Sequence, residues 1–173
     1  MTYFNVGLLI IRLVVGLTLA GHGSQKLFGW FGGPGLDGTT KMMEKLNIEP
    51  PRLWAWANAL AEFFGGLGLA LGLLTPFAAV ALVGAMLVAI FKVHWPNFWN
   101  SKRGLEYPLV MGLVSFAVGL IGAGLYSLDY LLGLPLRAPL AYAIALGLML
   151  LVVAWILVQS SQAQQTPEHE PSL

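Results

Sequence analysis

The chain has 173 residues, of which 57% are hydrophobic and 10% are charged. Soluble domains usually have about 25% charged residues, so this composition excludes a soluble globular protein and indicates an integral membrane protein. The absence of cysteine excludes disulfides, thiolate metal sites and iron–sulfur clusters within the chain, and the formal net charge of +1 gives no reason to expect a nucleic-acid partner.

The first apolar segment covers about residues 4–28, which is enough for the roughly 20 residues of a membrane crossing. It has no basic N-terminal region and no evident cleavage site, so we interpret it as a retained helix rather than a signal peptide. Arg12 and Lys26 share one helical stripe of this segment, and His22 lies beside that stripe. An arginine at membrane depth costs about 3 kcal/mol, so we expect Arg12 to face the protein interior with an acidic or carbonyl partner.

A hydrophilic connection follows at residues 29–53. Its second half, residues 40–46, has the pattern of a short amphipathic helix that Pro50 and Pro51 terminate. Residues 33–38 match G-x-G-x-x-G, but an apolar helix rather than a strand precedes them. We therefore reject a dinucleotide-binding fold and expect a flexible loop here.

Four more apolar segments follow, and we expect each of them to be a helix. The second segment, about residues 53–74, carries Glu62 near its middle on a stripe of small and polar residues, which suits close helix packing in lipid. The others cover about residues 77–91, 108–125 and 136–158. The sequence thus predicts an all-α, polytopic transmembrane helix bundle.

The distribution of basic residues predicts the orientation in the membrane. With five spans, the connections after the first and third segments lie on the same side of the membrane. The opposite side has one basic residue, Arg137. These two connections and the helix ends next to them have seven: Lys26, Lys41, Lys45, Arg52, Lys92, Lys102 and Arg103. The positive-inside rule then puts the N-terminus outside and the C-terminus in the cytoplasm.

Ionisable residues within membrane segments are functional candidates by default. Glu62 could pair with Arg12 or lie between Arg12 and His22, because helix tilt leaves both arrangements open. An Arg12–Glu62 pair could also serve only to fix helix register. His22 and His94 could be ordinary interfacial histidines, and Glu106 could be an acidic residue that the dipole of a helix N-terminus favours. No spacing motif supports haem ligation by the two histidines, and we predict no metal site.

Several motifs together carry a family resemblance. In chain order they are Arg12, His22-Gly-Ser-Gln-Lys26-Leu-Phe-Gly29, Glu62-Phe-Phe-Gly65-Gly66, Gly72-Leu-Leu-Thr-Pro76, Lys92-Val-His94, Glu106-Tyr-Pro108 and Gly122-Ala-Gly124-Leu-Tyr126-Ser-Leu-Asp129. With this set the chain resembles the DoxX family of small membrane proteins. The resemblance implies a four-helix bundle over residues 1–130, with an additional transmembrane helix at 131–158. The polar residues 159–173 are expected to form a disordered tail.

The family takes its name from a subunit of a thiosulfate:quinone oxidoreductase, so the resemblance implies a quinone-facing role in electron transfer at the cell (inner or plasma) membrane. We predict Glu62 and His22 as catalytic groups that pass protons. Arg12, Lys26, His94 and Glu106 are the predicted ligand-binding groups. The chain has no evident redox centre of its own. Electrons would come from a bound cofactor, a redox partner subunit or the substrate, and whether the chain is itself an enzyme stays open.

Two alternatives belong to other functional classes. The first is a non-catalytic scaffold or small transporter, in which the charges fix helix packing or line a polar passage. The second is a lipid- or isoprenoid-handling protein, which an aromatic belt including Trp54 and Trp95 favours. Small-residue stripes are compatible with packing within the chain or with a homo-oligomer in the bilayer.

Overall fold

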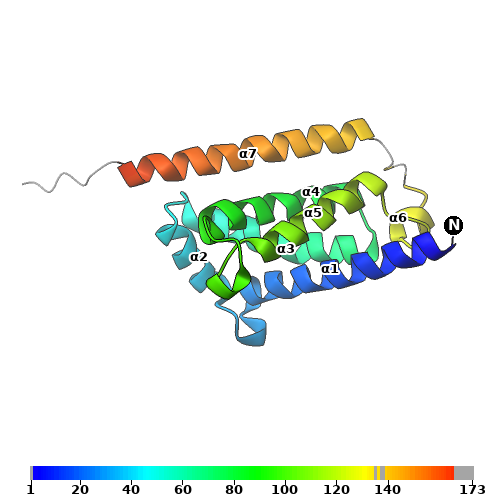
Figure 1. Ribbon diagram of the computed structural model, residues 1–173, viewed down its shortest axis with the longest axis horizontal. Coiled ribbons are helices and arrows are strands. Elements are labelled where there is room, and N and C mark those ends of the chain that lie inside the picture. The colour runs from blue at the N-terminus through cyan, green and yellow to red at the C-terminus, as the bar shows by residue number, and fades with distance from the viewer. Residues whose placement is uncertain (1, 135, 137–138, 166–173) are drawn as a thin grey trace, which may run out of the picture.

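The structure is a computed structural model, which describes residues 2–134, 136 and 139–165. Within these residues it is a bundle of α-helices with short connecting turns and no strand, as the sequence predicted (Figure 1). The α-helices are α1 (Thr2–Phe28), α2 (Gly35–Lys45), α3 (Pro51–Leu71), α4 (Thr75–Val88), α5 (Glu106–Ile121), α6 (Leu128–Leu131) and α7 (Pro139–Gln165). Shorter helical turns cover Trp30–Gly32, Ala89–His94 and Asn100–Lys102.

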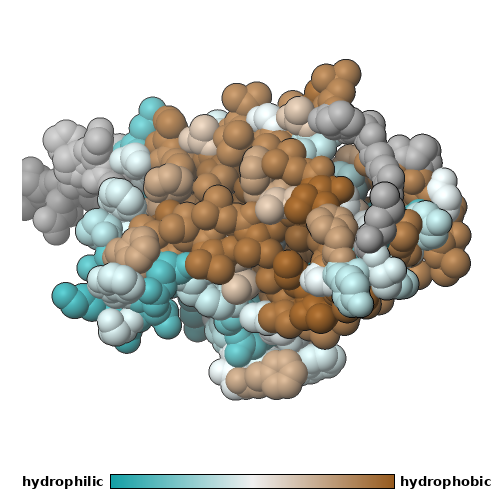
Figure 2. Space-filling model, turned by 45° about the vertical axis from the view of Figure 1, so that its right-hand side comes forward, coloured by the Kyte–Doolittle hydropathy of each residue, from teal (hydrophilic) through white to brown (hydrophobic). Residues whose placement is uncertain are grey.

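Among the described residues, three helices are long and apolar enough to cross a membrane: Thr2–Phe28, Thr75–His94 and Leu140–Ala163. The second of these is α4 continued by the π-helical turn Ala89–His94. The other two predicted segments are also helices, α3 and α5, and they run alongside the long ones (Figure 1). Hydrophobic side chains cover the middle of the molecule, and hydrophilic ones gather mainly toward the left-hand end of the view in Figure 2. The protein is built to lie in a lipid bilayer.

Glycines hold α1 and α3 at backbone contact. A Cβ atom added at Gly16 would lie 2.5 Å from the Ala70 nitrogen, and one added at Gly66 would lie 2.4 Å from the Ala20 nitrogen. At Gly23 the added atom would lie 2.3 Å from the Phe63 nitrogen. Real Cβ atoms do not approach backbone this closely, so only glycine permits this crossing. The predicted stripe of the first segment, with Gly16 and Gly23, therefore packs on α3, whereas Gly65 of the predicted stripe of the second segment faces Leu82 and Ala78 of α4.

The remaining helices pack around this pair. Buried apolar side chains from α1, α3, α4 and α5 form the main core, which includes Leu19, Leu69, Leu82 and Val118. The turn into α4 is tight, with Gly72 at φ 65° in the left-handed region that glycine adopts without strain.

The C-terminal helix α7 packs on the bundle. Its Tyr142 is buried in the main core and donates a hydrogen bond to the Phe116 carbonyl at 3.1 Å. Further along, a Cβ added at Gly84 of α4 would lie 2.4 Å from the Met149 sulfur, so Met149 fills the notch that this glycine leaves. The segment outside the predicted four-helix unit is thus part of the packed structure.

Two predicted boundaries differ in the structure. The glycine-rich stretch was expected to be a flexible loop, but α2 begins at Gly35 and includes Gly38. This helix forms because it buries Thr39 and Met43 against the bundle, and burial overrides the low helix propensity of glycine. At the other end α7 continues past Val158 to Gln165. The rest of the predicted tail, residues 166–173, lies outside the described residues.

Gly23→Ala tests the helix contact. We expect this change to destabilise the protein by about 1–3 kcal/mol, because the new methyl group must push α3 away from α1. The matched control is Gly21→Ala, since Gly21 lies on the same helix with no atom near its added Cβ. The control should be neutral or stabilising by up to about 1 kcal/mol. Reversible unfolding in mixed micelles measures both variants, and equal stabilities would contradict the described contact.

Candidate functional site

An ion pair joins α1 to α3. The Lys26 Nζ atom lies 2.5 Å from Glu62 Oε1 and donates a second hydrogen bond, at 2.7 Å, to Asn58 Oδ1. Lys26 occupies the last turn of α1, where the helix dipole favours a cation. The close approach of Gly23 to Phe63 brings this turn beside Glu62, whose side chain is only 2% exposed. The glycine contact therefore sets the position of the pair.

Polar atoms near this pair have unused hydrogen-bonding capacity. Glu62 Oε2 and the Tyr107 hydroxyl are both buried without a hydrogen-bond partner among the described residues. The Glu62 charge acts on the Tyr107 hydroxyl, and the Tyr107 ring lies 5.5 Å from that of His22, an exposed residue of α1. A buried polar atom without a partner costs about 1–3 kcal/mol, and such atoms are rare in native structures unless they serve a function.

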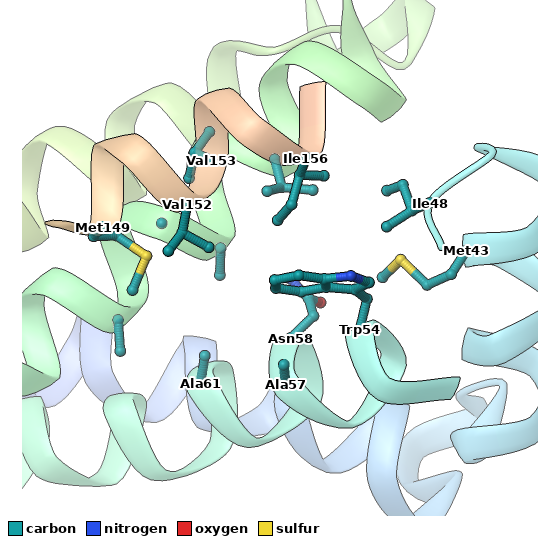
Figure 3. A pocket seen from close by; sticks show the side chains of 14 residues that line it. Met43, Ile48, Trp54, Ala57, Asn58, Ala61, Met149, Val152, Val153 and Ile156 are labelled. Atoms are coloured by element: carbon teal, nitrogen blue, oxygen red, sulfur yellow. The ribbon is translucent and has the colours of Figure 1, made fainter. Parts of the chain in front are cut away.

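An apolar cavity of about 110 Å³ lies next to Asn58, the second acceptor of Lys26. Its walls come from α2, α3, α4 and α7, and we call it the α3–α7 cavity; Figure 3 shows Met43, Trp54, Asn58, Val152 and Ile156 around it. Asn58 is the one amide in this lining, and its oxygen is the acceptor of the Lys26 hydrogen bond. Trp54 packs against Trp155 with ring centroids 5.9 Å apart, and its indole N–H donates to the Glu49 carbonyl. Asn58 thus connects the cavity to the ion pair.

Arg12 lies elsewhere, and the groups it contacts are backbone carbonyls. Its side chain is 1% exposed and donates to the carbonyl oxygens of Ala123, Tyr126 (2.7 Å) and Ala70 (3.4 Å). The nearby charge of Asp129 acts on the guanidinium. Arg12, which is part of α1, therefore holds together α1, α3 and the segment that comes after α5.

Asp129 fixes the same segment to the start of α4. Its carboxylate accepts hydrogen bonds from the Leu74 nitrogen at 2.7 Å and the Thr75 nitrogen at 3.0 Å, which are orphan donors at the helix N-terminus. Its own backbone nitrogen donates to the Gly72 carbonyl at 2.8 Å. The last predicted motif, residues 122–129, is thus a structural clamp together with Arg12.

The structure brings together some of the predicted site residues and separates others. Lys26 and Glu62 are paired. His22 lies beside Tyr107, on whose hydroxyl the Glu62 charge acts. The suggested Arg12–Glu62 pair is wrong, because the helix offset matches Glu62 with Lys26 and leaves Arg12 among carbonyls.

The two remaining predicted residues shape the connection between α4 and α5. His94 Nδ1 lies 2.7 Å from the Arg103 carbonyl oxygen, and Glu106 Oε1 accepts from the Asn100 nitrogen at 2.9 Å. Glu106 also occupies the first turn of α5, as the dipole interpretation expected. No contact among the described residues joins either side chain to Glu62. The described residues contain no group of three or more histidine or carboxylate side chains that could hold a metal ion.

Sequence reasoning missed Asn58, Tyr107 and Asp129 as site or clamp residues. Asn58 lies one helical turn before Glu62, so the spacing alone indicated a shared face. Tyr107 and Asp129 were noted only as parts of motifs, because nothing in their spacing indicates which helix they face.

These features define a small polytopic membrane protein with a buried ion pair at one end of a helical bundle and an arginine clamp further along α1. Comparison with known proteins gives the family. The DoxX family model matches residues 7–95, and the chain belongs to this family. No solved structure matches the chain.

Two relatives extend the similarity beyond that range. The chain is 26% identical over 130 residues to a Bacillus subtilis (strain 168) protein named "Putative oxidoreductase CatD", with 73% of this chain and 87% of that protein covered. It is 28% identical over 130 residues to "Inner membrane protein YqjF" of Escherichia coli (strain K12), with 74% of this chain and 93% of that protein covered.

The clamp makes a prediction for Arg12. Arg12→Met should lower the free energy of unfolding by about 3–5 kcal/mol, because the carbonyls of Ala123 and Tyr126 would stay buried without a donor. Arg12→Lys should also lower the free energy of unfolding, since one ammonium group cannot reproduce the planar set of N–H donors of the guanidinium group. Unfolding in mixed micelles, followed by circular dichroism, measures both. Wild-type stability in Arg12→Met would refute the clamp.

Proposed function

We propose that the chain is a quinone-binding component of a membrane oxidoreductase system, with the quinone head group at the Lys26–Glu62–Asn58 cluster. The observation that carries the proposal is the buried Oε2 atom of Glu62, which has no partner among the described residues although Oε1 is paired with Lys26, whose other acceptor, Asn58, lines an apolar cavity. Ligand sites are typically apolar pockets with a few polar groups, and here Asn58 is the amide in a mostly apolar lining, with Lys26 as its hydrogen-bond donor. The oxidoreductase name of the Bacillus subtilis relative is in line with this function.

The donors and acceptors fit a quinone ring. Lys26 has three N–H donors and uses two of them, so one is free for a carbonyl oxygen. Asn58 lies in the cavity wall, and its amide nitrogen makes no hydrogen bond among the described residues. Trp54 offers an aromatic surface in the same wall. A bound quinone supplies two-electron, two-proton chemistry.

The residues of the chain would handle the protons. Glu62 Oε2 is free to accept a proton from a hydroxyl group or to hold one for a carbonyl oxygen. Tyr107, between Glu62 and the exposed His22, offers a route for that proton to the aqueous surface. Lys26 stabilises negative charge on the bound oxygen. The electrons would come from a bound cofactor, a redox partner subunit or the substrate.

We further propose that the Lys26 end of the bundle faces the cytoplasm. The connections at this end carry the excess of basic residues, and the positive-inside rule puts such an excess on the cytoplasmic side. Protons would then enter and leave the site from that side through His22.

Glu62→Gln tests the site. The amide keeps the shape of the carboxylate but neither pairs with the Lys26 charge nor takes up a proton. Quinone co-purifying with the detergent-solubilised protein, quantified by extraction and mass spectrometry, should fall at least about tenfold. Lys26→Met should give the same loss.

Glu44→Gln is the matched control, because Glu44 is an exposed carboxylate on α2 away from the cluster. It should keep the wild-type quinone content, and all variants should show the wild-type elution profile. Unchanged quinone in Glu62→Gln, or only phospholipid in the wild type, would refute the proposal and favour a scaffold or transport role.

A further inference from the structure

We propose that the ligand of the Lys26–Glu62–Asn58 cluster has a long apolar tail, and that this tail lies in a groove between α3 and α4. The inference rests on the proposed function, because it assigns the tail of the same ligand. It selects a long-chain isoprenoid quinone over a small, water-soluble quinone.

A wide apolar groove runs along the outer side of α3 and α4. Its volume is about 660 Å³, and we call it the α3–α4 groove. Its floor consists of small residues, including Ala57, Ala61, Gly65 and Gly68 on successive turns of α3. Larger side chains, Leu67 and Phe77 among them, form its sides. Ionisable side chains are absent from its lining within the described part of the chain.

The groove borders the α3–α7 cavity. Ala57, Ala61 and Ala81 line both spaces, so only alanine methyl groups separate the two. From Ala57 the groove follows α3 to Leu71, a distance of about 20 Å at the rise of an α-helix. One end of this path is therefore next to the cavity that Asn58 lines, and the other end is at the turn into α4.

The sizes and the chemistry of the two spaces indicate one occupant. The cavity alone, at about 110 Å³, is smaller than the roughly 300–1,000 Å³ of typical ligand pockets, and the groove supplies the missing volume. A polar end followed by a long apolar path matches an amphipathic molecule with a ring at one end. In a bilayer the tail gains no hydrophobic energy by leaving lipid, so the close contacts of the groove must hold it.

Photo-crosslinking of the full-length protein tests the tail position. The probe is a ubiquinone head group carrying a decyl tail that ends in a diazirine, and mass spectrometry maps the labelled residues. We expect labelling within residues 60–81, and competition by an excess of the tail-less head group. Leu67→Trp, which narrows the groove without touching the ion pair, should reduce this labelling about tenfold.

Leu120→Trp is the matched control, since Leu120 is exposed on α5 and lines neither space; its labelling should equal the wild type. Scattered labelling over α5 and α7, in a protein that still binds the tail-less head group, would overturn this inference alone. The inference would also be overturned if the groove were labelled to the same extent in the presence of the tail-less head group and in Glu62→Gln. The groove would then hold any acyl chain. Failure to bind either quinone would refute the proposed function as well.

Discussion

The backbone contact between α1 and α3 is the constraint on which the rest of the structure depends. Gly16, Gly23 and Gly66 let the two helices approach more closely than any side chain allows. Helix association in lipid gains little from the hydrophobic effect, so this packing supplies much of the attraction. The contact also fixes the axial offset of the helices. That offset decides that Glu62 meets Lys26, although Arg12 lies on the same stripe of α1.

The two cations of α1 therefore have different surroundings and different tasks. Arg12 is enclosed by carbonyl oxygens. Its guanidinium N–H groups donate hydrogen bonds to these oxygens, so it binds the segment after α5 without pairing with a carboxylate. Lys26 keeps a side chain that is 21% exposed and a partner with one unused oxygen. A buried ion pair alone contributes little net stability, because desolvation offsets the attraction. The unused Glu62 oxygen beside the partly exposed Lys26 suits a ligand, whereas Arg12 uses its two terminal nitrogens to hold backbone carbonyls, which suits a structural role.

Much of the fold could be predicted from the sequence, because long apolar segments leave few alternatives to a helical bundle in lipid. The small-residue stripes likewise indicated which helix faces pack closely. That Arg12 faces the interior with an acidic or carbonyl partner could be predicted, but not that its partners are the carbonyls of Ala123 and Tyr126, because a backbone group leaves no trace in the residue pattern. The cavity was also beyond prediction. The α7 segment is apolar on all sides as far as Val158, and only docking through Tyr142 and Met149 shows which of its faces forms a wall.

The central claim is that Lys26, held by Glu62 and Asn58, binds the carbonyl oxygen of a quinone. Isotope-edited infrared difference spectroscopy of a bound quinone, labelled with carbon-13 at one carbonyl at a time, tests it most directly. We predict that one carbonyl stretch shifts to lower frequency in the wild type, and that Lys26→Met removes this shift while the other carbonyl is unaffected. Two unshifted carbonyl bands, or a shift that survives in Lys26→Met, would contradict the account.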